Sequence, residues 1–144
     1  MRSAGPAETE ALAADAAAKL TAGDVVLVSG ELGAGKTTFV RGAARALGVG
    51  EQVVSPTFTV GARYRARGVT VAHLDLYRLA SLEDEDPALL VDYLSAETIA
   101  FVEWPERADE GALGRVVLRV VLEHLGGDAR GVTLDWRLDR ERPR

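Results

Sequence analysis

The spacing of hydrophobic residues along the first third of the chain predicts a helix, a buried strand and a second helix. Residues 6–24 are rich in alanine with a few leucines, and a glycine near their end marks the expected close of an N-terminal helix. Residues 24–30 (DVVLVSG) form a short apolar run that ends in glycine, as is typical of a buried strand that leads into a turn. From Lys36 to Leu47 the apolar residues follow helical spacing, and Gly48 closes the segment.

The middle of the chain favours β-structure. Residues 57–77 (TFTVGARYRARGVTVAHLDLY) predict two strands joined at RARG. In the second strand, successive side chains point to opposite faces of the sheet, so His73 and Asp75 are expected on the same side.

The last third adds a helix, a strand and a hairpin. Residues 81–94 predict a helix in spite of an internal proline, and residues 98–104 (TIAFVEW) predict another buried strand. Residues 114–138 predict a hairpin around GGDARG, and residues from about 137 to 144 form a charged, frayed tail. The elements together predict one α/β domain over residues 1–144, with a mixed sheet, because the hairpins add antiparallel strands to a parallel start.

Composition narrows the function more than it narrows the fold. The 144 residues carry a net charge of -5, which argues against a broad basic surface that binds nucleic acid directly. Without cysteine there is no disulfide, thiolate metal site or cysteine nucleophile, and two histidines are too few for a histidine-built metal site. No stretch of sequence has the length and apolarity of a membrane span or a signal peptide, so we expect a cytoplasmic protein that does not bind a membrane.

The segment GELGAGKTTF (30–39) has the pattern of a phosphate-binding loop between a strand and a helix. Its glycines allow backbone N–H groups to turn toward phosphate oxygens, and the helix N-terminus favours an anion. Lys36 is expected to reach the β- and γ-phosphates, Thr37 to bind Mg²⁺ and Thr38 to contact the α-phosphate. The chain has only two lysines, and one of them stands at this position. The alternative is a glycine-rich turn that binds no ligand.

Two acidic residues at strand ends are candidates for the carboxylate that such a site needs beside its magnesium. Asp75 ends the strand of residues 69–75, and Glu103 directly follows the apolar residues 99–102. Glu103 fits the strand-end position better, and the alternative for both is a solvated turn residue. Pro56 restricts the backbone around Thr57, whose hydroxyl is a candidate sensor of the γ-phosphate; the alternative is a proline-initiated strand entry.

The sequence lacks the N-K-x-D motif that reads guanine, so ATP is the favoured nucleotide. A small-molecule kinase needs a lid or an arginine cluster, and only about a hundred residues follow the loop, most of them assigned to the sheet. The small-molecule kinase stays an alternative, and a second one is a binding module that is gated by a nucleotide and does not hydrolyse it.

Four segments in this order resemble the bacterial TsaE family (formerly YjeE). They are GELGAGKTTFVRG (30–42), SPTFT (55–59), HLDLYRL (73–79) and VEWPE (102–106). The resemblance implies a three-layer P-loop NTPase-like α/β fold and an Mg²⁺-dependent ATPase with slow hydrolysis that cycles between ATP and ADP. It further implies a role in making threonylcarbamoyladenosine beside the tRNA anticodon. The implied partners are TsaD and TsaB, with tRNA reached only through that complex, which ATP hydrolysis resets between turnovers.

The resemblance also assigns roles by position. It implies that Thr37 and Glu103 bind magnesium, that Asp75 lies near the γ-phosphate and that Trp104 lies beside the nucleotide; a core tryptophan is the alternative for Trp104. Further nucleotide contacts are implied at the N-terminal Thr9, at the C-terminal Arg130 and along the loop at Gly33, Ala34, Gly35, Lys36, Thr37 and Thr38. The segment DEDPALLVDYL (84–94) departs from the family pattern in its acidity and its proline, so its helix is expected to differ.

Overall fold

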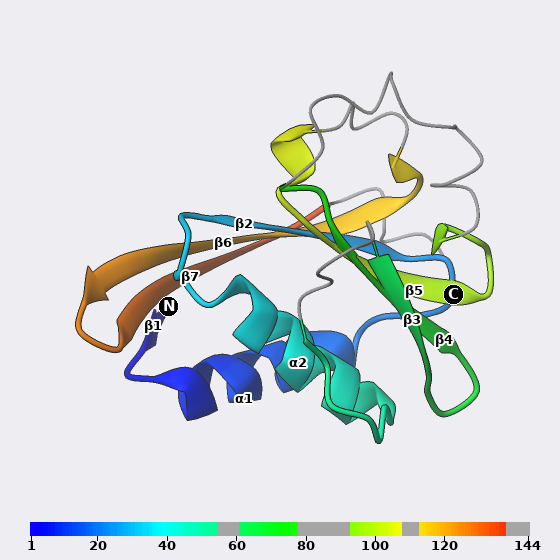
Figure 1. The fold of residues 1–144 in the computed structure, drawn as a ribbon, viewed down its shortest axis with the longest axis horizontal. Coiled ribbons are helices and arrows are strands. Elements are labelled where there is room, and N and C mark those ends of the chain that lie inside the picture. Colours follow the sequence, from blue (N-terminus) through cyan, green and yellow to red (C-terminus); the bar gives the residue numbers. More distant parts are fainter. Residues whose placement is uncertain (55–60, 78–92, 108–112, 138–144) are drawn as a thin grey trace.

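A mixed sheet forms the centre of the computed structural model, which describes residues 1–54, 61–77, 93–107 and 113–137 (Figure 1). Within these residues the sheet has seven strands. The strands are β1 (Arg2–Ser3), β2 (Val25–Gly30), β3 (Gly61–Arg65), β4 (Thr70–Asp75), β5 (Thr98–Glu103), β6 (Val116–Gly126) and β7 (Ala129–Trp136).

The strand order is β1-β7-β6-β2-β5-β4-β3. Strands β6, β2, β5 and β4 are parallel neighbours, and the pairs β1/β7, β6/β7 and β3/β4 are antiparallel. The predicted mixed sheet and its two hairpins are therefore confirmed. The carboxyl ends of β2, β4 and β5 meet at one edge, where Asp75 lies in register with Glu103 and Glu103 with Val28.

Both α-helices among the described residues, α1 (Pro6–Ala17) and α2 (Lys36–Leu47), cover the same face of the sheet (Figure 1). Helix α2 has the predicted bounds. The two helices pack closely because α1 is rich in alanine and α2 carries a glycine at the contact. A Cβ atom on Gly42 would lie 2.6 Å from the Glu10 Cα atom, so only glycine permits this separation. Beneath the helices the core includes Val26, Val28 and Phe101.

The opposite face of the sheet is also buried. Its apolar residues, among them Leu27, Leu74 and Val102, pack against Leu76, Leu113 and residues 93–94, which lie outside the strands. The sheet is thus covered on both sides, in agreement with the expected three layers. Residues 78–92, where most of the predicted helix 81–94 falls, lie outside the described residues, as do residues 55–60.

Helix α1 is shorter than predicted, since it ends at Ala17 rather than near Gly23. The chain leaves the helix in tight turns, with the Leu20 N–H group donating to the Ala17 carbonyl, and Leu20 is thereby buried in the core. The Asp24 carboxylate then accepts a hydrogen bond from the Thr21 N–H group at 2.8 Å. This polar turn separates the helix from β2, and an alanine-rich composition gives no sign of where it begins.

Strand β1 is absent from the sequence-based prediction. Two residues are too few to show a pattern, and the strand forms through its pairing with Arg130 and Gly131 of β7. The N-terminal ammonium group of Met1 donates to the Val132 carbonyl at 2.8 Å and ties the start of the chain to the hairpin.

Candidate nucleotide-binding site

The predicted phosphate loop connects the end of β2 to the start of α2. Three glycines give the loop its path, because Gly30, Gly33 and Gly35 have φ angles of 152°, 77° and 102°. A Cβ atom on Gly30 would lie 2.5 Å from the Leu122 carbonyl oxygen of the neighbouring strand. Helix α2 begins directly after Gly35, so the N–H groups of its first turn face the loop without intrahelical acceptors, an arrangement that suits an anion.

Lys36 lies inside the loop with only 5% of its surface exposed. Its ammonium group donates hydrogen bonds to the carbonyls of Gly30 at 2.7 Å and Glu31 at 2.8 Å. Burial lowers the pKa of Lys36 below that of an ordinary lysine, and the carboxylates of Glu103 and Asp75 partly oppose this shift. Since backbone carbonyls are neutral acceptors, the lysine keeps its positive charge available for an anionic ligand.

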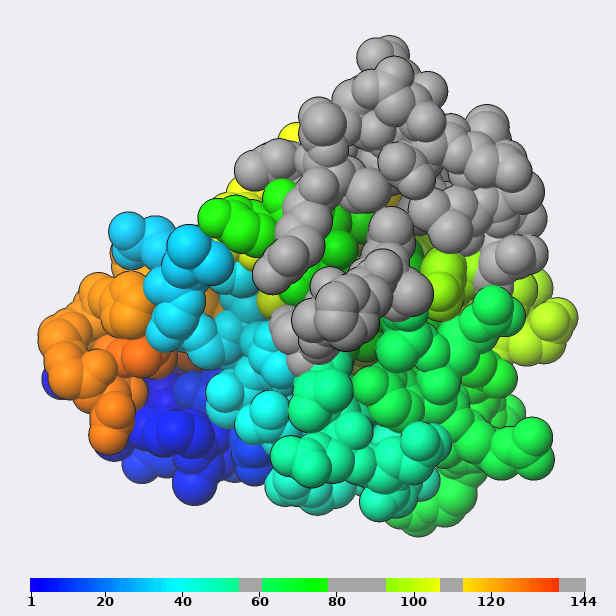
Figure 2. Space-filling model, viewed as in Figure 1, coloured from blue at the N-terminus to red at the C-terminus, as the bar shows by residue number. Residues whose placement is uncertain are grey.

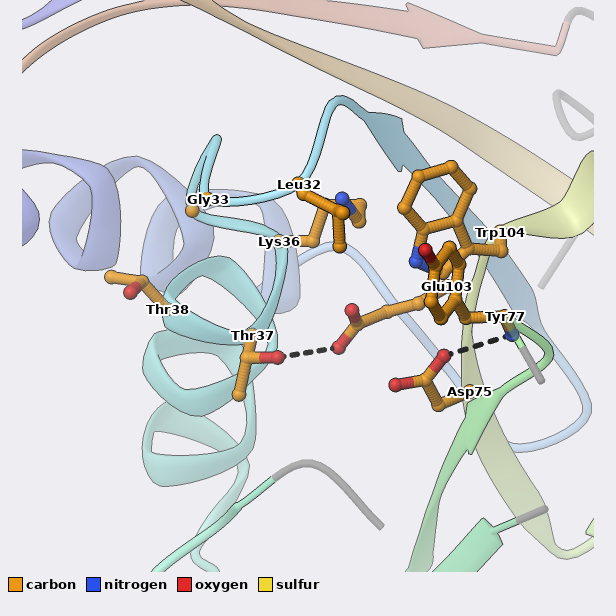
Figure 3. Close-up of a pocket in the computed structure, with 10 residues that line it drawn as sticks. Leu32, Gly33, Lys36, Thr37, Thr38, Asp75, Tyr77, Glu103 and Trp104 are labelled. Atoms are coloured by element: carbon orange, nitrogen blue, oxygen red, sulfur yellow. Dashed lines mark hydrogen bonds between the residues drawn. The ribbon is translucent and has the colours of Figure 1, made fainter. Parts of the chain in front are cut away.

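Glu103, at the end of β5, accepts a hydrogen bond from the start of helix α2, which follows the loop (Figure 3). The Thr37 hydroxyl donates to Glu103 Oε2 at 2.9 Å, across 66 residues of sequence. The Nε2 atom of His73, on β4, lies 2.6 Å from the same oxygen. Glu103 is 3% exposed and His73 is fully buried. A carboxylate is thus held at the base of the phosphate loop by two side chains from different elements.

Asp75 and two aromatic residues complete the edge of the site (Figure 3). An oxygen of Asp75 accepts a hydrogen bond from the Tyr77 N–H group at 3.1 Å. The Tyr77 and Trp104 rings lie 4.8 Å apart at an angle of 41°, and the Lys36 ammonium group is 4.2 Å from the centre of the Trp104 ring. Among the described residues, Trp104 is the one non-glycine residue with a positive φ angle, 58°. Trp104 therefore turns out of β5 and places its ring against the ammonium group of Lys36.

These residues surround a cavity of about 320 Å³. It is lined by Leu32, Gly33, Gly35, Lys36, Thr37, Thr38, Asp75, Tyr77, Glu103 and Trp104. All of these except Leu32 and Tyr77 are expected at the site from the sequence. Hydroxyl, carboxylate and phosphate oxygens, with water, are the ligands that Mg²⁺ prefers, so Thr37, Glu103 and Asp75 suit a magnesium ion shared with bound phosphates.

Arg130 contacts the phosphate loop from the β6–β7 hairpin. Its guanidinium group donates to the carbonyls of Ala34 and Gly33, each at 3.2 Å. It also donates to the carbonyls of Gly127 at 2.8 Å and Ala129 at 2.9 Å, within the hairpin itself. The loop and the orange hairpin are adjacent on the surface (Figure 2). In this structure Arg130 therefore binds the loop backbone and is not among the described residues that line the cavity.

Thr9 and Ala34, which the sequence also predicts as nucleotide contacts, are not among the described residues that line the cavity. Thr9 is buried on α1, and its hydroxyl lies 2.7 Å from the Ser3 hydroxyl, so it links the helix to β1. Ala34 is a buried residue of the loop itself, and its N–H group donates a hydrogen bond to the Glu31 carbonyl at 3.0 Å. Thr57 lies outside the described residues.

The sequence-based prediction assigned no role to His73, Tyr77 or Leu32. His73 had a detectable signal, since it shares a strand face with Asp75, two residues later, and that face meets Glu103. Tyr77 and Leu32 had none, because their place at the cavity depends on the turn after β4 and on the path of the loop.

The strand–loop–helix unit, with a buried carboxylate hydrogen-bonded to the threonine after the loop lysine, defines a P-loop NTPase type of fold and site. A family model described as threonylcarbamoyl adenosine biosynthesis protein TsaE matches residues 3–132. The chain belongs to the TsaE family. Among the described residues, no helix is both long enough and apolar enough to cross a membrane.

Two curated relatives and one solved structure illustrate the similarity. The tRNA threonylcarbamoyladenosine biosynthesis protein TsaE of Bacillus subtilis is 39% identical over 133 residues, which cover 92% of this chain and 82% of the relative. The protein of the same name from Treponema pallidum is 39% identical over 115 residues, covering 80% and 84% of the two chains. The crystal structure of Bacillus subtilis YdiB superimposes with a TM-score of 0.74 at 32% identity, covering 97% of this chain and 86% of that one.

Proposed function

We propose that this chain is a slowly ATP-hydrolysing accessory protein in the biosynthesis of tRNA threonylcarbamoyladenosine. The observation that carries the nucleotide part is the hydrogen bond from Thr37 to Glu103, beside Lys36 and at the mouth of one cavity. Family membership and the names of the relatives support the pathway. The proposed location is the cytoplasm.

In the proposed complex, the phosphates bind to the backbone N–H groups from Gly33 to Thr38. The Lys36 ammonium group exchanges its two carbonyl acceptors for oxygens of the β- and γ-phosphates, which are stronger acceptors because they are charged. The Trp104 ring beside this lysine limits the access of water and makes contact with the bound nucleotide.

Thr37 and Glu103 are the proposed magnesium positions, the carboxylate acting directly or through water. A bound Mg²⁺ neutralises charge that develops on the β- and γ-phosphates during hydrolysis. Asp75 lies next to Glu103 across the β4–β5 pairing and is proposed to orient the attacking water. Thr57 is proposed to respond to the γ-phosphate from the segment that follows α2.

Arg130 is proposed to act on the nucleotide through the loop that it holds. A direct contact between Thr9 and the nucleotide is not part of the proposal, because its buried hydroxyl is paired with that of Ser3.

The proposed partners are TsaD and TsaB, with tRNA reached through them. The net charge of -5 is consistent with this indirect route, since direct tRNA binding relies on basic surface. ATP hydrolysis would then release or reset the partner complex between cycles of modification.

The proposal is tested by two measurements on the full chain. The first follows release of inorganic phosphate from ATP with Mg²⁺ or with EDTA, alone and with purified TsaB–TsaD. We expect slow, Mg²⁺-dependent hydrolysis, and transfer of the γ-phosphate to a metabolite instead of water would identify a kinase. Tight ATP binding without turnover in the presence of the partners would identify a binding module.

The second measurement follows association with TsaB–TsaD by size-exclusion chromatography in ATP, in ADP and without nucleotide. We expect the nucleotide to control the amount of complex. Lack of association in all three conditions would contradict the pathway assignment and leave the ATP site standing.

A further inference from the structure

His73 makes a buried polar contact that packing of the core alone does not require. The ring is fully buried on β4, on the same strand face as Val71, and its Nε2 atom lies 2.6 Å from Glu103 Oε2. An apolar side chain would fill this part of the core without the expense of burying two ring nitrogens. The histidine is therefore better explained by what it does to Glu103.

The other ring nitrogen indicates which atom carries the proton. His73 Nδ1 is buried and has no hydrogen-bond partner among the residues that the structure describes. If the proton were on Nδ1, it would be a buried donor without an acceptor. In that tautomer Nε2 would also have no proton to donate to the adjacent carboxylate. The Nε2–H tautomer leaves only an unpaired lone pair, and it donates to the carboxylate.

With this tautomer, Glu103 Oε2 accepts two hydrogen bonds, from the Thr37 hydroxyl and from the imidazole. The two donors come from different elements, α2 and β4, so together they restrict rotation of the carboxyl group. The second oxygen, Oε1, has no hydrogen bond to any described residue and belongs to a side chain that lines the cavity. One oxygen is thus used for fixation and the other is presented to a ligand.

We propose that His73 is a positioning residue, whose Nε2–H group fixes the Glu103 carboxylate so that the site holds Mg²⁺ with its nucleotide. The inference rests on the proposed nucleotide function. It assigns His73 no contact with phosphate, metal or water, and its action is through Glu103 alone.

The test compares three variants in a binding assay that requires no turnover. His73→Leu removes the donor and keeps an apolar filling of similar size. His73→Gln returns an N–H donor at about the reach of Nε2. Val71→Ala is the matched control, since Val71 is buried on the same strand face and only the packing changes.

Calorimetry measures the affinity for the non-hydrolysable analogue adenylyl imidodiphosphate in Mg²⁺ and in EDTA. For His73→Leu we expect affinity in EDTA close to that of the wild type, and a Mg²⁺ requirement raised about 10- to 100-fold, the usual consequence of losing a partner of a metal-site carboxylate. His73→Gln should recover most of the difference, and Val71→Ala should retain the wild-type requirement.

The outcomes separate this inference from the proposed function. If the wild type shows no Mg²⁺-dependent gain in affinity, the magnesium site is wrong and the role of His73 falls with it. If the gain is present and His73→Leu retains it as Val71→Ala does, only the positioning role is overturned.

A measurement on the wild type tests the inference even if the His73 variants do not fold. The chain contains two histidines, so ring ¹⁵N resonances assign readily, with His124→Gln as the assignment control. We expect the Nε2–H tautomer for His73, and the Nδ1–H tautomer would overturn the inference.

Discussion

The phosphate loop and the carboxylate cluster meet at one cavity, yet they are built in different ways. The loop is a run of consecutive residues, and its chemistry comes from the backbone and one lysine. The cluster of Thr37, His73, Asp75 and Glu103 has one member on α2, two on β4 and one on β5. The conformation of the loop depends on glycine, whereas the geometry of the cluster depends on the register of β4 against β5.

Because of this difference, substitutions in the loop and substitutions in the cluster should impair different functions of the site. A change in the loop should act on the binding of phosphate itself, because the loop supplies the N–H groups and the ammonium group. A change in the cluster should act on the binding of magnesium and on turnover, because the cluster supplies the carboxylate and hydroxyl oxygens of the proposed magnesium site. Substitutions on each side can therefore break the two functions independently.

The largest expected effect is on the loop side. Lys36→Ala removes the one ammonium group that lines the cavity, and we expect ATP affinity to fall by about 2–5 kcal/mol, or about 30-fold to several thousand-fold. Lys19→Ala is the control, since Lys19 is the only other lysine and its ammonium group lies over Trp136, at the other end of β7 from Arg130. Calorimetric titration with ATP compares the two. Equal affinities would show that Lys36 does not bind phosphate.

A substitution in the carboxylate cluster should lower the rate of ATP hydrolysis. Glu103→Gln keeps the size of the side chain and removes its charge, so we expect hydrolysis to fall by about 100-fold, with nucleotide affinity in EDTA almost unchanged. Glu97→Gln makes the same chemical change on an exposed residue directly before β5. Phosphate release under saturating ATP and Mg²⁺ measures the effect. Normal hydrolysis in Glu103→Gln would remove this residue from the catalytic role.

The same contrast explains how much the sequence predicts. The loop is predictable residue by residue, since a strand, glycines at fixed spacing and a helix start are local signals. Asp75 and Glu103 are also predictable, because both end apolar strands and such ends meet at one edge of a parallel sheet. Helix α2 and both hairpins also match their predicted positions, because local sequence signals specify them.

The contacts that the sequence does not predict are long-range. The hydrogen bond between His73 and Glu103 requires β4 and β5 to be neighbours in one particular register, and no local pattern specifies that pairing. Arg130 is a second case in which the sequence does not predict the contact that the structure shows. Similarity to the family suggested a nucleotide contact, and the structure places its guanidinium on carbonyls of the loop. The predicted end of α1 is wrong because alanine-rich sequence continues beyond Ala17.

The backbone basis of the loop is tested by Gly30→Ala. The new Cβ atom would meet the Leu122 carbonyl oxygen at 2.5 Å in a conformation that favours glycine, so we expect a loss of about 1–3 kcal/mol in the free energy of unfolding. Gly50→Ala is the control, since a Cβ atom there would have no neighbour within 4 Å. Urea denaturation measures both. A Gly30→Ala variant as stable as Gly50→Ala would mean that the loop relaxes, and the loop would not be set by this contact.

The smallest effect is expected where the loop is supported from outside. Arg130→Ala removes the guanidinium that holds the Gly33 and Ala34 carbonyls and leaves every group that lines the cavity in place. We therefore expect ATP to bind about two- to tenfold more weakly, equally in Mg²⁺ and in EDTA, as for the loss of about 0.5–1.5 kcal/mol of hydrogen bonding. Arg45→Ala, which breaks only an exposed ion pair with Glu10, is the matched control. A loss that appears only with Mg²⁺ would place Arg130 with the carboxylate cluster, and a loss as large as that of Lys36→Ala would mean that the guanidinium turns to meet the nucleotide.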